Sequence, residues 1–141
     1  MKKKIYNLKN IYIPFKISKY NNNFYLSIEI DIENTDNANS NFINEYLNLE
    51  KEIKNNILDF KNKNFYSNLK INEYKNKKYY LFRLQLKKNK NKIITTYLKE
   101  NEPTNIFKLE YRNFYSCNIE ISGIWIFNNT YGLQLNINSI Y

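Results

Sequence analysis

The densest group of residues that could do chemistry is the segment 77–83, KKYYLFR, in which aromatic rings and cations are interleaved. If this segment is a strand, Tyr79 and Arg83 lie on the same face, because side chains alternate between the two faces of a strand. An exposed flat ring can stack on a nucleic-acid base, and a neighbouring cation can pair with the phosphate backbone. The pattern therefore indicates a surface for binding a nucleic-acid strand with little dependence on base sequence.

Further cations and rings follow this segment. Only two of the 22 basic residues are arginine, and we rank Arg83 and Arg112 first among the cations, because arginine both stacks on bases and forks to phosphate. Trp125 fits a stacking platform, but the pattern slightly favours a core position in a hairpin. The candidate nucleic-acid-binding residues are Tyr79, Arg83, Lys87, Lys88, Lys90, Lys92, Tyr97, Tyr111, Arg112 and Trp125, with Phe114 and Tyr115 as additional rings.

The overall charge is consistent with this interpretation without requiring it. The chain has 22 basic and 13 acidic residues, a formal net charge of +9. A strongly basic balance favours a polyanionic partner. However, the abundance of Asn, Lys, Ile, Tyr and Phe, beside a single alanine, is typical of a very AT-rich genome. Part of the basicity and of the aromatic content can therefore come from codon usage.

Several kinds of chemistry have no residues to support them. The chain has no histidine, which removes Ser-His and Cys-His nucleophile pairs and most zinc sites. The one cysteine, Cys117, cannot form an intramolecular disulfide, and we expect it in the core. Glu29, Asp31 and Glu33 alternate along a predicted strand and could hold magnesium in a nuclease, although such a row is more often a solvated face. We expect no enzyme activity, no cofactor and no metal.

The N-terminal half predicts a hairpin and then a helix. Residues 11–18 and 24–33 both alternate apolar and polar side chains, and the asparagines between them favour a turn, so the two segments should pair. An amphipathic helix of about five turns follows, capped by Ser40 or Asn41. Its apolar face is Phe42, Tyr46, Leu49, Ile53, Ile57 and Phe60.

The C-terminal half predicts more strands. Short segments at 69–71 and 106–111 and a strand at 79–88 that pairs back with 93–98 lead into a long hairpin, 114–140. This hairpin turns at 128–130 and holds the only two glycines, Gly123 and Gly132, which we expect at a bulge, a bend or a close backbone approach. About seven strands and one long helix predict an α+β fold, mainly antiparallel β, most simply a small barrel.

We expect one domain covering residues 1–141, in which residues 1–10 could form a basic arm. No apolar run reaches the roughly 20 residues of a membrane helix. The start of the chain lacks the apolar core of a signal peptide, so an intracellular protein is expected.

The C-terminal half resembles a known family. The basic hairpin from Tyr79 to Leu98, the strand ISGIWI at 121–126 and the strand start Tyr131-Gly132-Leu133 look like the closing part of OB folds in single-stranded DNA-binding proteins of large DNA viruses and phages. The resemblance covers residues 79–140. It implies an OB-like barrel that binds single-stranded DNA in replication, recombination or repair.

Two alternatives and several details stay open at this point. The chain could instead be a structural or assembly protein of a virus, whose basic surface reflects codon usage, or, less in keeping with the pattern, the magnesium-dependent nuclease considered above. The partner could be single-stranded DNA or RNA, and the protein could form a homo-oligomer. No membrane partner is expected.

Overall fold

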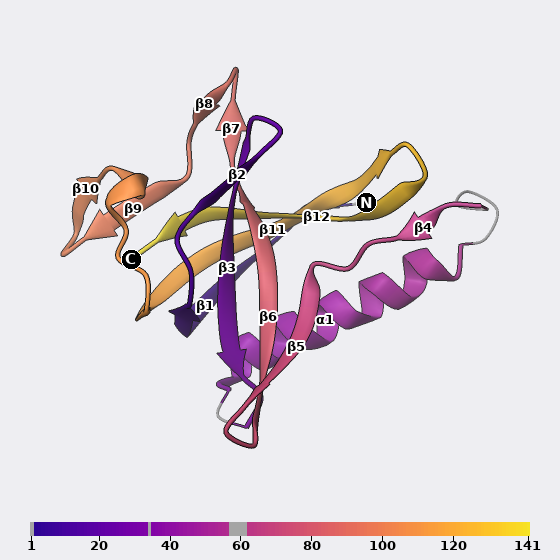
Figure 1. Cartoon of the computed structure of the whole chain (residues 1–141), viewed down its shortest axis with the longest axis horizontal. Coiled ribbons are helices and arrows are strands. Elements are labelled where there is room, and N and C mark those ends of the chain that lie inside the picture. The colour runs from indigo at the N-terminus through magenta and orange to yellow at the C-terminus, as the bar shows by residue number, and fades with distance from the viewer. Residues whose placement is uncertain (1, 34, 57–61) are drawn as a thin grey trace.

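The computed structural model describes residues 2–33, 35–56 and 62–141. Within them the chain forms twelve strands, one α-helix and one 3-10 helix (Figure 1). The strands are β1 (Lys4–Ile13), β2 (Ser18–Tyr20), β3 (Asn23–Asp31), β4 (Asn64–Phe65), β5 (Leu69–Tyr74), β6 (Lys77–Leu86), β7 (Lys88–Asn89), β8 (Lys92–Ile93), β9 (Thr96–Lys99), β10 (Glu102–Thr104), β11 (Asn113–Phe127) and β12 (Thr130–Ile140). The helices are α1 (Asn37–Lys54) and η1 (Ile106–Lys108).

Five long strands close into a ring. β1 pairs with β11 and β3, β3 pairs with β6, and β12 pairs with both β11 and β6. The pairings are antiparallel except between β12 and β6, where Asn136 lies opposite Gln85 in a parallel register. A closed ring of five strands with this one parallel contact is an OB-like barrel. The α+β class and the barrel are thus confirmed; the strand number exceeds seven because short strands decorate the ring.

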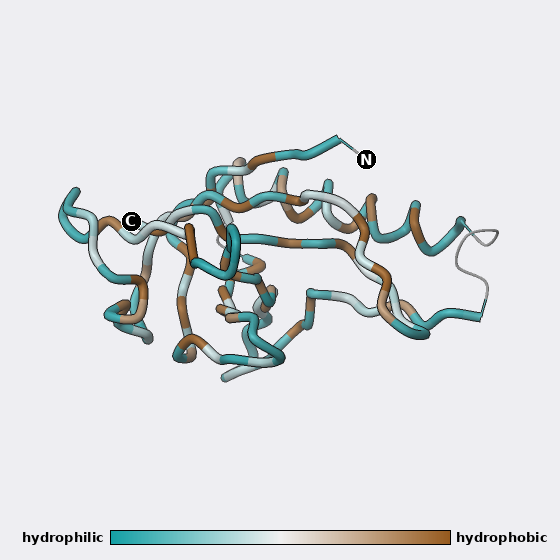
Figure 2. The backbone as a smooth tube through the Cα atoms, turned by 90° about the horizontal axis from the view of Figure 1, so that it is seen from above, coloured by the Kyte–Doolittle hydropathy of each residue, from teal (hydrophilic) through white to brown (hydrophobic). Residues whose placement is uncertain are grey.

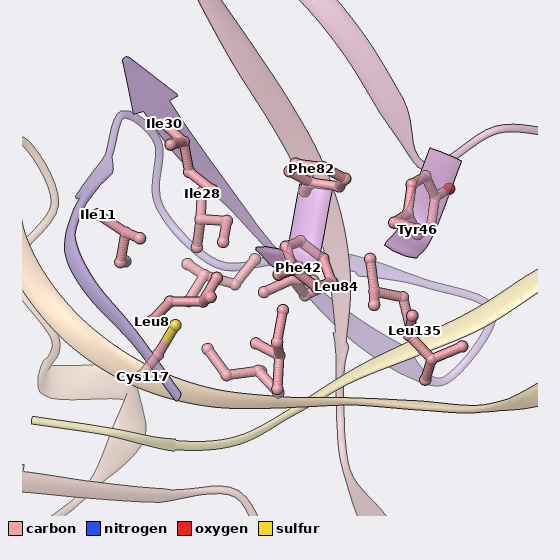
Figure 3. Close-up of a cluster of buried hydrophobic side chains, with 14 of the residues drawn as sticks. Leu8, Ile11, Ile28, Ile30, Phe42, Tyr46, Phe82, Leu84, Cys117 and Leu135 are labelled. Atoms are coloured by element: carbon pink, nitrogen blue, oxygen red, sulfur yellow. The ribbon is translucent and has the colours of Figure 1, made fainter. Parts of the chain in front are cut away.

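The barrel interior is a continuous apolar core (Figure 3). Inward-facing residues of the ring strands, such as Leu8, Ile28 and Leu84, are buried, and Figure 2 shows the alternation of apolar and polar positions along the chain. α1 adds Phe42 and Tyr46 to this core, and the Phe42 ring lies 5.0 Å from that of Phe82. The helix therefore closes the barrel with its apolar face, as the sequence pattern predicted.

The start of α1 differs from the prediction. The helix begins at Asn37, because Asp36 rather than Ser40 or Asn41 is the cap and accepts a hydrogen bond of 2.8 Å from the Asn39 backbone. The Asn39 side chain then bonds the backbone of Lys9 in β1 and so ties the helix to the barrel. The described part of the helix ends at Lys54; Ile57 and Phe60 lie outside the described residues.

The N-terminal strands also differ from the prediction. Residues 4–10 belong to β1 and pair with β11 instead of forming an arm, because Leu8 is buried in the core. The predicted pairing of 11–18 with 24–33 is confirmed, but the first segment is interrupted: Tyr12 of β1 lies opposite Glu29 of β3, and β2 forms a short hairpin with β3. Asn21 and Asn22 form its turn with φ angles of 49° and 66°, which asparagine tolerates better than most residues. Phe15, one of the apolar residues of the alternating segment 11–18, is 55% exposed.

Two segments in the C-terminal half also needed tertiary information. Residues 93–98 do not pair back on β6; β7 and β8 form a separate small hairpin, while β9 pairs with β10 and β12. Residues 106–111 contain η1 instead of a strand, because the Asn105 side chain caps the backbone of Phe107. The long hairpin is confirmed, with a register shift between Ile121 and Gly123 that makes Gly123 a bulge.

None of the helices in the described residues is long and apolar enough to cross a membrane.

Candidate nucleic-acid interface

A groove of about 430 Å³ opens between the β2–β3 turn and the tip of the β11–β12 hairpin. We call it the aromatic groove. Its floor is formed by the outward faces of β3, β6 and β12, and its walls come from the two hairpins and the segment before β5. Its rings are Tyr20, Tyr25, Tyr66, Trp125 and Phe127; its single charged residue is Arg83, and its amides are Asn21, Asn23, Asn68, Gln85 and Gln134.

Arg83 is placed by the pairing of β3 with β6. In this register Ser27 lies opposite Arg83 and Tyr25 lies opposite Gln85, so Tyr25 is the diagonal neighbour of Arg83. The guanidinium carbon lies 3.7 Å from the centre of the Tyr25 ring. Among the described residues, no carboxylate lies within 4.0 Å of this cation. Arg83 therefore stacks on a ring without a carboxylate partner in the described part of the chain.

Trp125 is placed by a glycine. It lies directly opposite Gly132 in the β11–β12 pair. A Cβ atom at Gly132 would stand 3.1 Å from the Trp125 indole and 2.5 Å from the Tyr66 carbonyl oxygen. The prediction of a close approach is confirmed here. At Gly123 a Cβ atom would meet nothing within 4 Å, so that glycine marks the bulge alone.

Tyr66 completes the wall beside Trp125. Its backbone amide donates a 2.8 Å hydrogen bond to the carbonyl of Tyr131, which holds the segment after β4 against β12. The centres of the Tyr66 and Trp125 rings are 6.0 Å apart. Both rings are half-buried, so each is held by packing and still presents surface to the groove.

The rim and floor of the groove differ in how firmly they are held. Tyr20 and Phe127 stand at the tips of the two hairpins and are 63% and 68% exposed. On the floor, the side-chain amide of Gln134 donates to Gln85 at 3.1 Å and to Asn136 at 2.7 Å. The groove thus has exposed rings at its edges and a fixed polar floor.

Among the residues predicted from the sequence, Arg83 and Trp125 meet in the aromatic groove. Lys88 and Lys92 border a second hollow between the β2–β3 turn and the β7–β8 hairpin, and Lys90 is exposed at the tip of that hairpin. Tyr111 lies elsewhere, with the Lys16 ammonium and the Arg112 guanidinium each 5.4 Å from its ring centre.

Three predicted residues are not available for a strand in the groove. Tyr97 is 5% exposed and packs edge-on against Tyr115, so it belongs to the core. The prediction that Tyr97 is a stacking platform is therefore corrected. Lys87 is bound to the buried Glu120, with 2.6 Å between ammonium and carboxylate. Tyr79 lies in a different hollow from Arg83, although both are on the same face of β6.

That hollow, of about 910 Å³, we call the acidic hollow. Its charged residues are Glu29, Asp31, Asp36, Glu73 and Lys9, and its rings are Tyr12, Tyr74, Tyr79 and Phe114. Burial raises the pKa of Glu29. Glu33, expected in a row with Glu29 and Asp31, lies beyond the end of β3 and donates its backbone amide to Asp31. In the described parts of the chain, no three His, Cys, Asp or Glu side chains are grouped to hold a metal ion.

Sequence reasoning missed four rings of the groove: Tyr20, Tyr25, Tyr66 and Phe127. Tyr25 had a usable signal, because it occupies an outward position in an alternating strand, as Arg83 does. Tyr66 had none, since its segment shows no periodic pattern and reaches the groove only by pairing with β12.

Comparisons with known proteins give a match in structure alone. No protein-family model and no curated protein matches the sequence. The fold is similar to the crystal structure of gp2.5, a single-stranded DNA-binding protein encoded by bacteriophage T7, with a TM-score of 0.61 and 9% sequence identity. The alignment covers 98% of this chain and 85% of that chain. The resemblance predicted from residues 79–140 is thus confirmed as a likeness of fold, and it extends over nearly the whole chain.

Proposed function

We propose that this protein binds single-stranded DNA in the aromatic groove, with little dependence on base sequence, in support of replication, recombination or repair. The observation that carries the proposal is that one groove brings together Trp125 and Tyr66 in its wall and Tyr25, stacked with Arg83, on its floor. This arrangement offers several flat rings beside one cation that has no carboxylate partner among the described residues.

The position of the groove on the barrel supports the same function. β3 and β6 are the second and third strands of the ring, and the β11–β12 turn joins the fourth and fifth. In OB folds, the face of strands 2 and 3 and the loops between strands 1–2 and 4–5 bind oligonucleotides. The fold is also that of a phage protein described as a single-stranded DNA-binding protein.

The chemistry required is binding without a reaction. Bases would stack on Trp125 and on the exposed rings of Tyr20 and Phe127, each stacked base contributing roughly 1–3 kcal/mol. Arg83 would contact phosphate and release counterions, which makes the affinity depend on salt. Nothing in this mechanism needs a histidine, a metal or a nucleophile.

The first test is fluorescence anisotropy of a labelled oligo-dT at two salt concentrations, with duplex DNA and oligo-U as competitors. We expect binding that weakens strongly with salt, resists competition by duplex and quenches the emission of Trp125, the only tryptophan. Equal competition by duplex would contradict the proposal. Equal competition by oligo-U would extend the partner to RNA. Arg83→Gln should weaken binding, while Lys75→Gln, which removes an exposed cation in the turn between β5 and β6, serves as the control.

One observation favours the alternative of an assembly protein. Ile124 and Ile126 are 39% and 56% exposed, and among the described strands this part of β11 pairs only with β12. An exposed apolar strand edge can pair with another copy of the chain. Light scattering over a range of concentrations would support this function if the protein assembles without DNA and if Ile126→Lys abolishes assembly.

A further inference from the structure

The second hollow carries positive charges that are not balanced by acidic residues in the described part of the chain. It lies between the β2–β3 turn and the β7–β8 hairpin, has a volume of about 520 Å³, and is bordered by Lys19, Lys88 and Lys92 without any acidic residue. Among the described residues, no carboxylate lies within 4.0 Å of these ammonium groups. We call it the lysine hollow. Three cations kept together without counter-charges repel one another, and a bound anion would relieve that repulsion.

The lysines are held in place by the two hairpins. The Lys88 ammonium donates to the backbone carbonyl of Asn22 and so joins the β7–β8 hairpin to the β2–β3 turn. The Lys19 ammonium lies 5.6 Å from the centre of the Phe24 ring. Lys90 and Asn91 form the tip of the second hairpin with φ angles of 50° and 66°. The hollow is therefore built by two tight turns that face each other, which Figure 1 shows side by side at the top of the view.

The lysine hollow and the aromatic groove share one wall. Residues of the β2–β3 hairpin line both: Tyr20, Asn21 and Asn23 border the groove, while Lys19, Asn22 and Phe24 border the hollow. A strand that leaves the groove past Tyr20 meets the hollow directly behind the turn. The hollow carries cations but its ring, Phe24, is covered by Lys19 and packs edge-on against Phe107 at 5.1 Å. It is thus suited to phosphates rather than to stacked bases.

We propose that the lysine hollow is a second subsite, which takes the phosphates of the same single strand after it has passed around the β2–β3 turn. This inference rests on the proposed function of the groove. It implies that short oligonucleotides fill the groove alone, whereas longer ones also reach the hollow. Each phosphate contact on a single strand contributes about 0.7 to the slope of log affinity against log salt. Loss of two lysines should therefore lower the slope for long strands by about 1.4.

The test compares Lys88→Glu/Lys92→Glu with the wild-type protein on a series of oligo-dT lengths, of about 4 to 20 nucleotides, which spans the site sizes known for single OB folds. The control is Lys51→Glu/Lys75→Glu, which changes the net charge equally at exposed positions outside the aromatic groove and the lysine hollow. We expect the Lys88/Lys92 variant to bind the shortest strands within about twofold of the control and to lose the gain in affinity with length, with the reduced salt slope.

The outcomes separate the two proposals. If the wild-type protein binds no length of oligo-dT, the proposed function fails. If it binds but the Lys88/Lys92 variant keeps the length dependence and salt slope of the control, only the subsite is overturned. A loss that is equal at every length also overturns it, because the lysines would then act on the groove itself. Thermal unfolding checks that each variant is folded, and Lys19→Gln/Lys92→Gln, which introduces no acidic group, repeats the test without charge reversal.

Discussion

Tyr79 and Arg83 lie on the same face of the same strand, yet the charges around them differ in sign. They are four positions apart along the strand, roughly 13 Å. Arg83 lies opposite Ser27, with Tyr25 as its diagonal neighbour, in a groove without carboxylates. Tyr79 lies opposite Asp31 in a hollow with four carboxylates and one lysine.

The difference between the aromatic groove and the acidic hollow shows what an interleaved aromatic and basic pattern can and cannot establish. The pattern along β6 is a property of one strand, whereas a binding surface is made by several. Cross-strand neighbours decide whether a ring stands beside free cations or beside acids. The acidic hollow has rings enough to stack bases, but its carboxylates would repel the phosphates between them.

The sharpest way to break this comparison is to remove one ring from each region. Trp125→Ala should lower the affinity for oligo-dT by roughly 5- to 150-fold, because it removes a stacking platform. Tyr79→Ala should stay within twofold of the wild-type protein. Anisotropy titrations measure both, and Trp125→Phe, which keeps a ring, should retain part of the affinity. A loss in Tyr79→Ala as large as that in Trp125→Ala would show that the DNA follows the whole face of β6.

A second prediction concerns the glycine beneath Trp125. Gly132→Ala places a methyl group 2.5 Å from the Tyr66 carbonyl oxygen and 3.1 Å from the indole, so the backbone and the ring must both move. Overpacking of this kind costs about 1–3 kcal/mol. We expect a lower Tm, a shifted Trp125 emission and weaker binding of oligo-dT. Unchanged emission together with unchanged affinity would mean that the position of the indole is not set by this contact.

A third prediction uses two carboxylates whose pKa values move in opposite directions. Burial raises the pKa of Glu29, so ionisation of Glu29 opposes folding, and its contribution to stability is lost as pH rises through its folded pKa. Burial of Glu120 acts the same way, but its hydrogen bond from Lys87 and the nearby Lys3 hold its pKa below the ordinary value. Glu120 therefore stabilises the protein above its unfolded pKa, and this contribution is lost as pH falls.

We accordingly expect Glu29→Gln to raise the Tm slightly at pH 7. Glu120→Gln should lower the Tm by several degrees, corresponding to about 1–2 kcal/mol. The effect is no larger because Lys3 and Lys87, the two partners of Glu120, are partly exposed to solvent. The Tm differences from the wild-type protein should shrink towards pH 3 in both variants. Thermal unfolding followed by circular dichroism across this pH range provides the measurement. A lower Tm in Glu29→Gln at pH 7 would contradict this prediction, because it would mean that ionised Glu29 stabilises the folded protein.

The smallest effect of bound DNA is expected in the barrel core, at Cys117. Cys117 is fully buried, and burial raises the pKa of its thiol to about 12. A thiol reagent should therefore react with the native protein far more slowly than with the unfolded chain, and saturation with oligo-dT should not change that rate much. Rapid labelling of the native protein would indicate that the β11–β12 side of the barrel opens readily.

The sequence by itself determined the features that depend on local spacing. Period-two alternation located the long strands, and the three- and four-residue spacing located the helix. The rarity of glycine marked Gly123 and Gly132 as places for a bulge, a bend or a close approach, and the structure has one bulge and one close approach there. The asparagine pair at 21–22 identified the turn that leads into β3, although not the break that separates β1 from β2 before it. Residues 106–111 have a strand-like composition, but a single cap at Asn105 turns their start into η1.

Only the tertiary structure decided which outward residues share a surface. The aromatic groove joins Tyr25, Arg83 and Trp125, which come from three strands, and the ring closes where β12 meets β6 in parallel, about fifty residues apart in the chain. Alternation fixes the face on which a side chain lies, but the neighbour across the strand depends on register and on which strands pair. Those are set by the packing of the whole barrel core, which no local pattern contains.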